Sequence, residues 1–331
     1  MTLSSAHAAP IPTALLQLLA DGREHSGTEL GERLGISRAA IWKQLQALDE
    51  LGIALEAVPG RGYRLREPLD LLDAAAIHAA LAGQLELASL EVFSRIDSTN
   101  AFFLSDDRPT ESNLRVALAE QQTAGRGRRG RAWVSPFAGN IYCSIKRQFP
   151  CGLEGLSGLS LVVGLAIAQA LEALGIAGVQ LKWPNDLRAD GHKLGGVLIE
   201  LAGDAGGPCT AVVGFGINVK MPSDSAQTID QLWTDLRQLH SQLPSRNTIV
   251  AGILLRLAQA LAQFAEEGFA PFAAAWSARD EFRGRPVQIT GVNVQQSGIA
   301  VGVDERGALL LDTDSGRRAI VAGEVSLRGS A

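Results

Sequence analysis

The sequence predicts an α+β protein of three parts: a winged helix-turn-helix over residues 1–67, a mixed α/β domain over residues 68–283 and a small β-barrel over residues 284–331. Short amphipathic helices and a hairpin occupy the first part, strands and helices mix in the second, and short strands separated by turn residues fill the third. A length of 331 residues with 46% apolar residues is enough for two or three folded units.

The N-terminal part has the helix signals of a DNA-reading motif. Ser26-Gly27-Thr28-Glu29 is typical of a capping box that opens a helix. After a tight turn, Ser37 is expected to cap a second helix in which Ile41, Leu45 and Leu48 share one face. Two helices that meet across so short a turn predict a helix-turn-helix whose second helix enters the major groove of DNA.

A hairpin with the basic tip Pro59-Gly60-Arg61-Gly62 is expected to follow as a wing. Ordinary solvated charges on a compact three-helix unit are the alternative interpretation. The candidate DNA-binding residues are Ser37, Arg38, Lys43, Gln44, Arg61 and Arg64.

Composition excludes several classes of protein. A net charge of -5 argues against nonspecific coating of nucleic acid. Three cysteines without a Cys-x-x-Cys pair suit reduced thiols in the cytoplasm, and the scattered histidines predict no structural metal. Residues 159–179 are very apolar, but Gln169 and Glu172 interrupt them, so a buried helix is expected and no membrane contact.

The loop Gly125-Arg126-Gly127-Arg128-Arg129-Gly130-Arg131 has the spacing of a dinucleotide-binding loop, but its surroundings do not fit one. Pro136 disfavours the helix that must follow, and Lys146-Arg147-Gln148 occupies the place of the expected carboxylate. Four arginines among glycines instead predict a clamp for phosphate or carboxylate. Taken alone, the loop is equally compatible with a solvated, disordered basic segment.

Five other segments favour the clamp. Asp97-Ser98-Thr99-Asn100 and Gln121-Gln122 supply polar groups, and Lys182-Trp183-Pro184-Asn185-Asp186 surrounds a rigid turn. Lys193-Leu194-Gly195-Gly196 is expected to precede an apolar strand. Gly214-Phe215-Gly216-Ile217-Asn218 follows another strand, where glycines let a ligand lie against the backbone.

These motifs occur together and in one order, and on them the chain resembles the bifunctional bacterial biotin protein ligases, which also repress the biotin operon. The resemblance covers nearly the whole chain and implies a class II synthetase-like ligase centre and an SH3-like barrel. It implies that biotin and MgATP give biotinyl-5'-AMP and pyrophosphate, and that a lysine of the biotin carboxyl carrier protein of acetyl-CoA carboxylase then takes the biotin. Attack of a carboxylate on a phosphate brings like charges together, so positioning and cations should supply most of the catalysis.

The resemblance also implies roles for individual residues. Arg126, Lys193 and Asp186 are the catalytic candidates, with Asp186 near magnesium or the attacking lysine. The biotin-binding candidates are Ser98, Thr99, Asn100, Gln122, Gly125, Arg126, Gly127, Arg128, Trp133, Lys193, Gly196 and Gly214. The ATP-binding candidates are Arg126, Arg128, Lys182, Asn185, Asn218, Trp233 and Arg328. Both tryptophans are also compatible with core positions, and Asn218 with a turn.

Repression would follow if biotinyl-5'-AMP acts as corepressor, orders the clamp and favours a homodimer whose two heads read two operator half-sites. The dimer surface would then compete with docking of the carrier protein. Three alternatives stay open: a lipoate-type ligase, a transcription factor that senses biotin without turnover, and a ligase whose head binds no operator.

Overall fold

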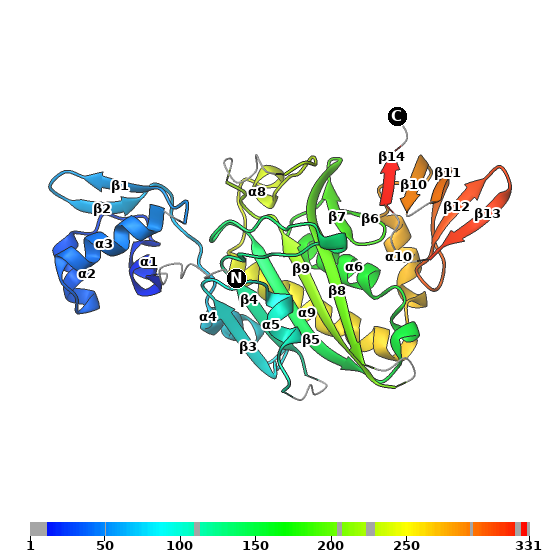
Figure 1. The fold of residues 1–331 in the computed structure, drawn as a ribbon, viewed down its shortest axis with the longest axis horizontal. Helices are drawn as coiled ribbons and strands as arrows, with labels where there is room; N and C mark the ends of the chain where they lie inside the picture. Colours follow the sequence, from blue (N-terminus) through cyan, green and yellow to red (C-terminus); the bar gives the residue numbers. More distant parts are fainter. Residues whose placement is uncertain are drawn as a thin grey trace, which may run out of the picture.

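The computed structural model describes residues 12–49, 51–108, 113–203, 207–222, 229–291, 294–321 and 326–329. Its three parts follow one another along the molecule, with the helical head at one end and the small β-sheet domain at the other (Figure 1). The large mixed sheet and its helices lie between them. This architecture confirms the predicted fold class.

The head consists of three helices and a hairpin. The elements are α1 (Thr13–Leu19), α2 (Gly27–Leu34), α3 (Arg38–Asp49), β1 (Leu55–Val58) and β2 (Gly62–Leu65). Ser26 Oγ accepts a hydrogen bond from the N–H of Glu29 at 3.0 Å, and Ser37 Oγ accepts one from Ala40 at 3.2 Å. Both predicted N-caps are therefore confirmed, and Gly35 ends α2 with a φ of 66°.

The central domain is built, within the described residues, on a seven-stranded sheet in the order β3-β4-β5-β9-β8-β7-β6. The strands are β3 (Ser89–Phe93), β4 (Arg115–Ala119), β5 (Ile141–Phe149), β6 (Gln180–Lys182), β7 (Asp186–Ala189), β8 (His192–Gly203) and β9 (Cys209–Ile217). Only the β3–β4 pair among them is parallel. The helices are α4 (Ala74–Leu81), α5 (Thr99–Leu104), α6 (Leu159–Ala173), α8 (Leu236–Leu239), α9 (Arg246–Glu267) and α10 (Ala273–Ala278), with 3-10 turns at Arg128–Gly130, Leu153–Leu156 and Ala270–Phe272.

Helices cover both faces of this sheet (Figure 1). Ile145 and Val213 belong to the main core with α6 and α9, whereas Ala117 and Val212 pack against Phe103 of α5. Alternate residues of a strand point to opposite faces, so α5 lies on the face opposite α6 and α9. Two expectations are wrong. Lys193 to Gly196 lies inside β8, because the tight β7–β8 turn at Asp190 and Gly191 starts that strand at His192. Gly214 to Ile217 lies inside β9, because this strand stays paired with β5 and β8 up to Ile217.

Residues 153–173 and 246–267 are long and apolar enough for membrane spans, with 67% and 50% of their windows buried inside the protein. Both segments pack in the core of the central domain, and α6 contacts α9 directly. Their apolar character is explained by this burial. The expected buried helix is α6, which begins at Leu159 and ends at Ala173.

The C-terminal part is a five-stranded antiparallel sheet within the described residues, ordered β13-β12-β11-β10-β14. Its strands are β10 (Pro286–Gly291), β11 (Val294–Val303), β12 (Leu309–Thr313), β13 (Gly316–Ile320) and β14 (Ser326–Gly329). Trp183 Nε1 donates to the carbonyl of Gly307 at 3.0 Å, which fastens this domain to the cis-proline turn of the central domain. Val287 and Ile289 are continuous with the main core.

The segment that joins these two domains contains a buried carboxyl with a perturbed pKa. Burial raises the pKa of Asp280 from 3.8 to about 6, with Glu281 adding to the effect, while a hydrogen bond from the N–H of Phe282 and the charge of Arg283 oppose it. Because the folded protein holds this proton more tightly than the unfolded chain, its stability should fall as pH rises from about 4 to about 6.

We therefore expect Asp280→Asn to raise the free energy of unfolding by up to about 3 kcal/mol near pH 8 and by less near pH 5. The asparagine can still accept from Phe282, so only the charge is removed. Urea unfolding of both proteins at the two pH values measures the difference. An equal gain in the free energy of unfolding at both pH values would contradict this explanation.

Candidate active site

A pocket of about 880 Å³ lies on the central domain. Most of the predicted site residues line it: Ser98, Thr99, Asn100, Gln122, Arg126, Gly127, Arg128, Trp133, Lys182, Asn185, Asp186, Lys193, Gly196, Gly214, Asn218 and Trp233. Gly125 lies behind the lining, where a Cβ atom would be 2.6 Å from the carbonyl oxygen of Trp133. Arg328 belongs to β14, opposite Gln288, and its side chain lies outside the described parts of the chain.

The polar end of the pocket is set by the start of α5. Ser98 is the N-cap of this helix, so Thr99 and Asn100 are held in its first turn and are nearly buried. Gln122 Oε1 accepts a hydrogen bond from the backbone N–H of Thr99 at 2.9 Å and lies 3.2 Å from the Thr99 hydroxyl oxygen. Two segments that are distant in sequence thus form one cluster of short hydrogen-bonding groups.

Glycines of β9 make room for this cluster and for the aromatic wall. A Cβ on Gly214 would lie 2.2 Å from Asn100 Oδ1, and a Cβ on Gly216 would lie 2.5 Å from the Trp133 ring. Only glycine permits these contacts without displacement of a side chain. Both glycines belong to the motif Gly214-Phe215-Gly216-Ile217-Asn218, but only Gly214 was predicted to bind biotin.

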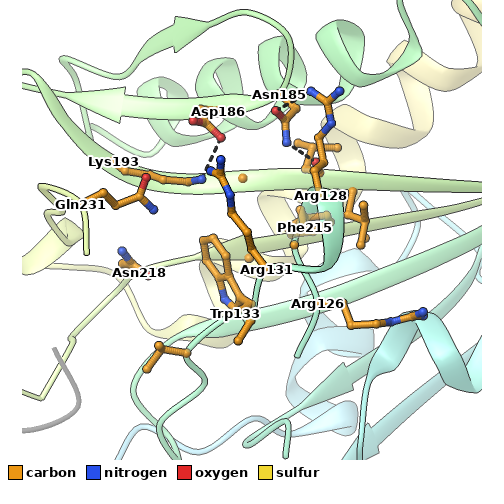
Figure 2. A pocket seen from close by; sticks show the side chains of 18 of the residues that line it. Arg126, Arg128, Arg131, Trp133, Asn185, Asp186, Lys193, Phe215, Asn218 and Gln231 are labelled. Atoms are coloured by element: carbon orange, nitrogen blue, oxygen red, sulfur yellow. Dashed lines mark hydrogen bonds and ion pairs between the residues drawn. The ribbon is translucent and has the colours of Figure 1, made fainter. Parts of the chain in front are cut away.

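A lysine, a carboxylate and an aromatic ring meet near the other end of the pocket (Figure 2). Lys193 Nζ lies 2.9 Å from Asp186 Oδ1 and 5.6 Å from the centre of the Trp133 ring. Asp186 faces Gly196 across the β7–β8 pair. The ammonium group is therefore oriented by charge on one side and by a π surface on the other.

Two further cations are partly removed from water. Burial lowers the pKa of the Arg128 guanidinium and of the Lys182 ammonium, and the nearby Asp186 carboxylate opposes both shifts. Arg128 Nη1 donates to Asn185 Oδ1 at 3.3 Å. Desolvated cations attract an anionic ligand more strongly than exposed ones, because less water screens the charge.

The arginine loop is folded back on itself. The N–H of Gly127 donates to the carbonyl of Arg131 at 2.7 Å, and the N–H of Trp133 donates to Gly125 at 2.8 Å. Arg126 Nη2 pairs with Glu200 Oε2 at 3.1 Å. Figure 2 shows that the Arg126 side chain points away from Lys193, whereas the Arg131 side chain points toward Asp186. The sequence predicted a closing role for Arg126 and did not single out Arg131.

Asn218 and Trp133 carry polar atoms that make no hydrogen bond with the described residues. These atoms are Asn218 Oδ1 and Trp133 Nε1, and both are buried. Asn218 Nδ2 donates to the carbonyl of Thr234 at 3.0 Å, so its amide is fixed with the oxygen unsatisfied. Buried polar atoms of this kind are costly unless a ligand or water completes them. Trp233 lies beside Lys193 through a bridge between their backbones.

Sequence reasoning missed two residues next to the polar end. Ser144, on β5, lies within hydrogen-bonding distance of Thr99 and Asn100, and Glu200, on β8, accepts from Asn100 Nδ2 at 2.8 Å. Each is a polar residue with apolar neighbours on both sides in its strand. That pattern was the signal available, since buried polar groups need partners.

Asp186 is the predicted metal ligand. Within the described part of the chain, no group of three or more His, Cys, Asp or Glu residues could hold a metal ion. Magnesium bound with a nucleotide takes only one or two protein carboxylates, the rest of its ligands being phosphates and water. The Asp186 carboxylate, beside Asn185 in the pocket, fits that requirement.

The predicted DNA-binding residues lie on α3 and the wing. Arg38 begins α3 and is exposed, Lys43 is exposed on the face of α3 opposite its buried residues, and Gln44 is half-buried. Trp42, which the sequence analysis passed over, is 55% exposed next to Lys43. In the wing, Arg61 pairs with Glu24 at 3.0 Å and Arg64 with Glu56 at 2.9 Å.

Comparison with known proteins agrees with this arrangement. The biotin/lipoate A/B protein ligase family matches residues 92–218, an HTH domain matches residues 13–64, and the biotin protein ligase C-terminal domain matches residues 283–328. The chain is 31% identical to a solved biotin protein ligase from Aquifex aeolicus in complex with biotin and ATP, with a TM-score of 0.63, over 74% of this chain and all of that one.

Two curated relatives differ in how much of this chain they cover. The biotin--[acetyl-CoA-carboxylase] ligase of Paracoccus denitrificans is 35% identical over 72% of this chain and 100% of its own length. The bifunctional ligase/repressor BirA of Salmonella typhimurium is 43% identical over 97% of this chain and 98% of its own length. The chain therefore belongs to the biotin protein ligase family, in the bifunctional form that carries a helix-turn-helix repressor domain.

Proposed function

We propose that the pocket binds biotin and ATP and joins them. An oxygen of the biotin carboxylate attacks the α-phosphorus of ATP, pyrophosphate leaves, and biotinyl-5'-AMP remains bound. The amine of a lysine on the biotin carboxyl carrier protein of acetyl-CoA carboxylase then attacks the acyl carbon, and AMP leaves. The observation that carries this proposal is the convergence of Lys193, Lys182 and Arg128 on one pocket, where they can offset the repulsion between carboxylate and phosphate.

We assign the two ends of the pocket by chemistry. The short polar groups at Ser98, Thr99 and Gln122 suit the ureido ring of biotin, and the Trp133 wall suits its apolar part. The nucleotide then lies toward Asn218 and Trp233, with Lys193 at the reacting oxygen. Magnesium bound with ATP would lie near Asp186 and draw charge from the leaving pyrophosphate. Arg126 would leave Glu200 when the anionic ligand arrives.

Pyrophosphate exchange into ATP tests the substrate assignment. We expect exchange that depends on biotin and not on lipoate or octanoate. Exchange supported equally by lipoate would favour a lipoate-type ligase, and binding of biotin without exchange would favour a sensor without turnover.

Repression is proposed to depend on the same ligand. Biotinyl-5'-AMP would act as corepressor by ordering residues 125–131, favouring a homodimer and bringing two heads to two operator half-sites. Sedimentation should then show a larger dimer fraction with biotin and MgATP than without. No change in the dimer fraction would contradict this mechanism. We further propose a cytoplasmic location and domain boundaries at residues 67 and 283.

Removal of positive charge from α3 should separate the two activities. We expect Arg38→Ala and Lys43→Ala each to weaken binding to the biotin-gene promoter and to lower the salt dependence of binding by about one unit of slope per lost phosphate contact. Ligase activity should stay unchanged, because both side chains are exposed on α3, which contributes no residue to the pocket. Filter binding across a salt series provides the measurement. Unaltered affinity in both variants would favour a head that binds no operator.

A further inference from the structure

A hydrogen-bond network of polar side chains lies beneath the polar end of the pocket. Asn100 Nδ2 donates to Glu200 Oε2 at 2.8 Å. Ser144 Oγ lies 2.5 Å from Asn100 Oδ1 and 2.7 Å from Thr99 Oγ1. Ser144 has no exposed surface and does not line the pocket, whereas Thr99 does. Any effect of Ser144 on a ligand must therefore pass through its neighbours.

At Asn100, the donors and acceptors of this network can be assigned in only one way. Its amide nitrogen faces two acceptors, the carboxylate of Glu200 at 2.8 Å and the carbonyl of Leu198 at 3.3 Å. The amide oxygen consequently faces Ser144, and it can only accept. Ser144 must donate its single hydroxyl hydrogen to Asn100, which leaves none for Thr99.

The hydrogen between Ser144 and Thr99 must then come from Thr99. Two hydroxyl oxygens 2.7 Å apart repel each other unless one donates to the other. The competing acceptor, Gln122 Oε1, is farther from the Thr99 hydroxyl, at 3.2 Å, and already accepts from the Thr99 backbone at 2.9 Å. The Thr99 hydrogen thus points into the protein, and an oxygen lone pair is left to face the pocket.

We propose that Ser144 is a positioning residue that makes the Thr99 hydroxyl an acceptor toward the ligand and so selects a group with an N–H at that place. The ureido ring of biotin carries such N–H groups. A ligand with an oxygen there would meet a lone pair and lose the hydrogen bond. This inference rests on the proposed position of the ureido ring against Thr99.

The test uses the full-length chain and two biotin analogues, each with one ureido N–H replaced by oxygen. Titration calorimetry gives the ratio of the dissociation constants of analogue and biotin. For the analogue altered at the nitrogen that faces Thr99, we expect Ser144→Ala to reduce this ratio by about tenfold, because Thr99 can then turn its hydrogen toward the pocket. Ser144→Cys keeps the side-chain size with a weaker donor, so it should give an intermediate ratio and serves if the alanine variant is unstable. Ser89→Ala, which removes a half-buried strand hydroxyl bonded to Glu91, is the control and should leave the ratio unchanged.

A double-mutant cycle with Thr99→Val separates this inference from the function on which it rests. If Ser144 acts through Thr99, adding Ser144→Ala to Thr99→Val should change the ratio by less than about twofold. A wild-type ratio in both Ser144 variants, or an additive effect in the cycle, overturns the role of Ser144. Unchanged biotin affinity in Thr99→Val shows instead that the ureido ring lies elsewhere, and it overturns both proposals.

Discussion

Replacement of Lys193 by methionine is expected to slow biotin-dependent pyrophosphate exchange by about a hundred- to a thousandfold, the usual cost of losing one charge-stabilising donor. Lys193, to which we assign the reacting oxygen, lies 2.9 Å from Asp186 and over the Trp133 ring. Methionine preserves the volume and removes the charge. Because the charge develops during the reaction, kcat should fall more than KM rises.

Lys220→Met is the matched control for this experiment. Lys220 forms an ion pair with Glu67 and does not line the pocket. The control should exchange pyrophosphate at the wild-type rate. A Lys193 variant that retains more than about a third of wild-type kcat would contradict the assigned role, because a transition-state contact is worth far more.

Gly216→Ala is expected to weaken biotin binding by about ten- to a hundredfold, as overpacking against a fixed wall commonly does. The new methyl group would lie 2.5 Å from Trp133, so the ring must move into the space assigned to the ligand. Titration calorimetry with biotin measures the loss. The change tests the aromatic wall without altering any polar or charged group.

Gly164→Ala provides the comparison. Gly164 lies in α6, and a Cβ there would meet Leu181 Cδ2 at 3.5 Å, an ordinary contact. Alanine is also the better helix former, so this variant should bind biotin normally and unfold no more easily than the wild type. Equal biotin affinity in both glycine variants would refute the steric argument at Gly216.

Local patterns predicted the parts of the fold that have strong local signals. The caps at Ser26 and Ser37 agree with the structure because each depends on neighbouring residues. The short elements β3, β6, β7 and α5 were not predicted. Elements of three to six residues carry too little periodicity, and these elements are stabilised by pairing and packing with distant segments.

Some features of the candidate site could be predicted from the sequence, and others could not. Motif residues from five segments line one pocket, as the glycines and cations in them indicated. The orientation of Arg126 could not be predicted, because it depends on Glu200, 74 positions away in sequence. The role of Ser144 could not be predicted either, because its partners Thr99 and Asn100 belong to another element. Only the three-dimensional contacts show which atom donates.

Transfer of biotin to a carrier domain tests the central claim most directly. The purified full-length chain would be incubated with biotin, MgATP and a biotin carboxyl carrier domain, and the mass of the carrier would be measured. We predict the addition of one biotinyl group at a single lysine, dependent on both biotin and ATP. A carrier of unchanged mass, with the ligase folded and biotin bound, would contradict the assignment of this pocket as a biotin-activating centre.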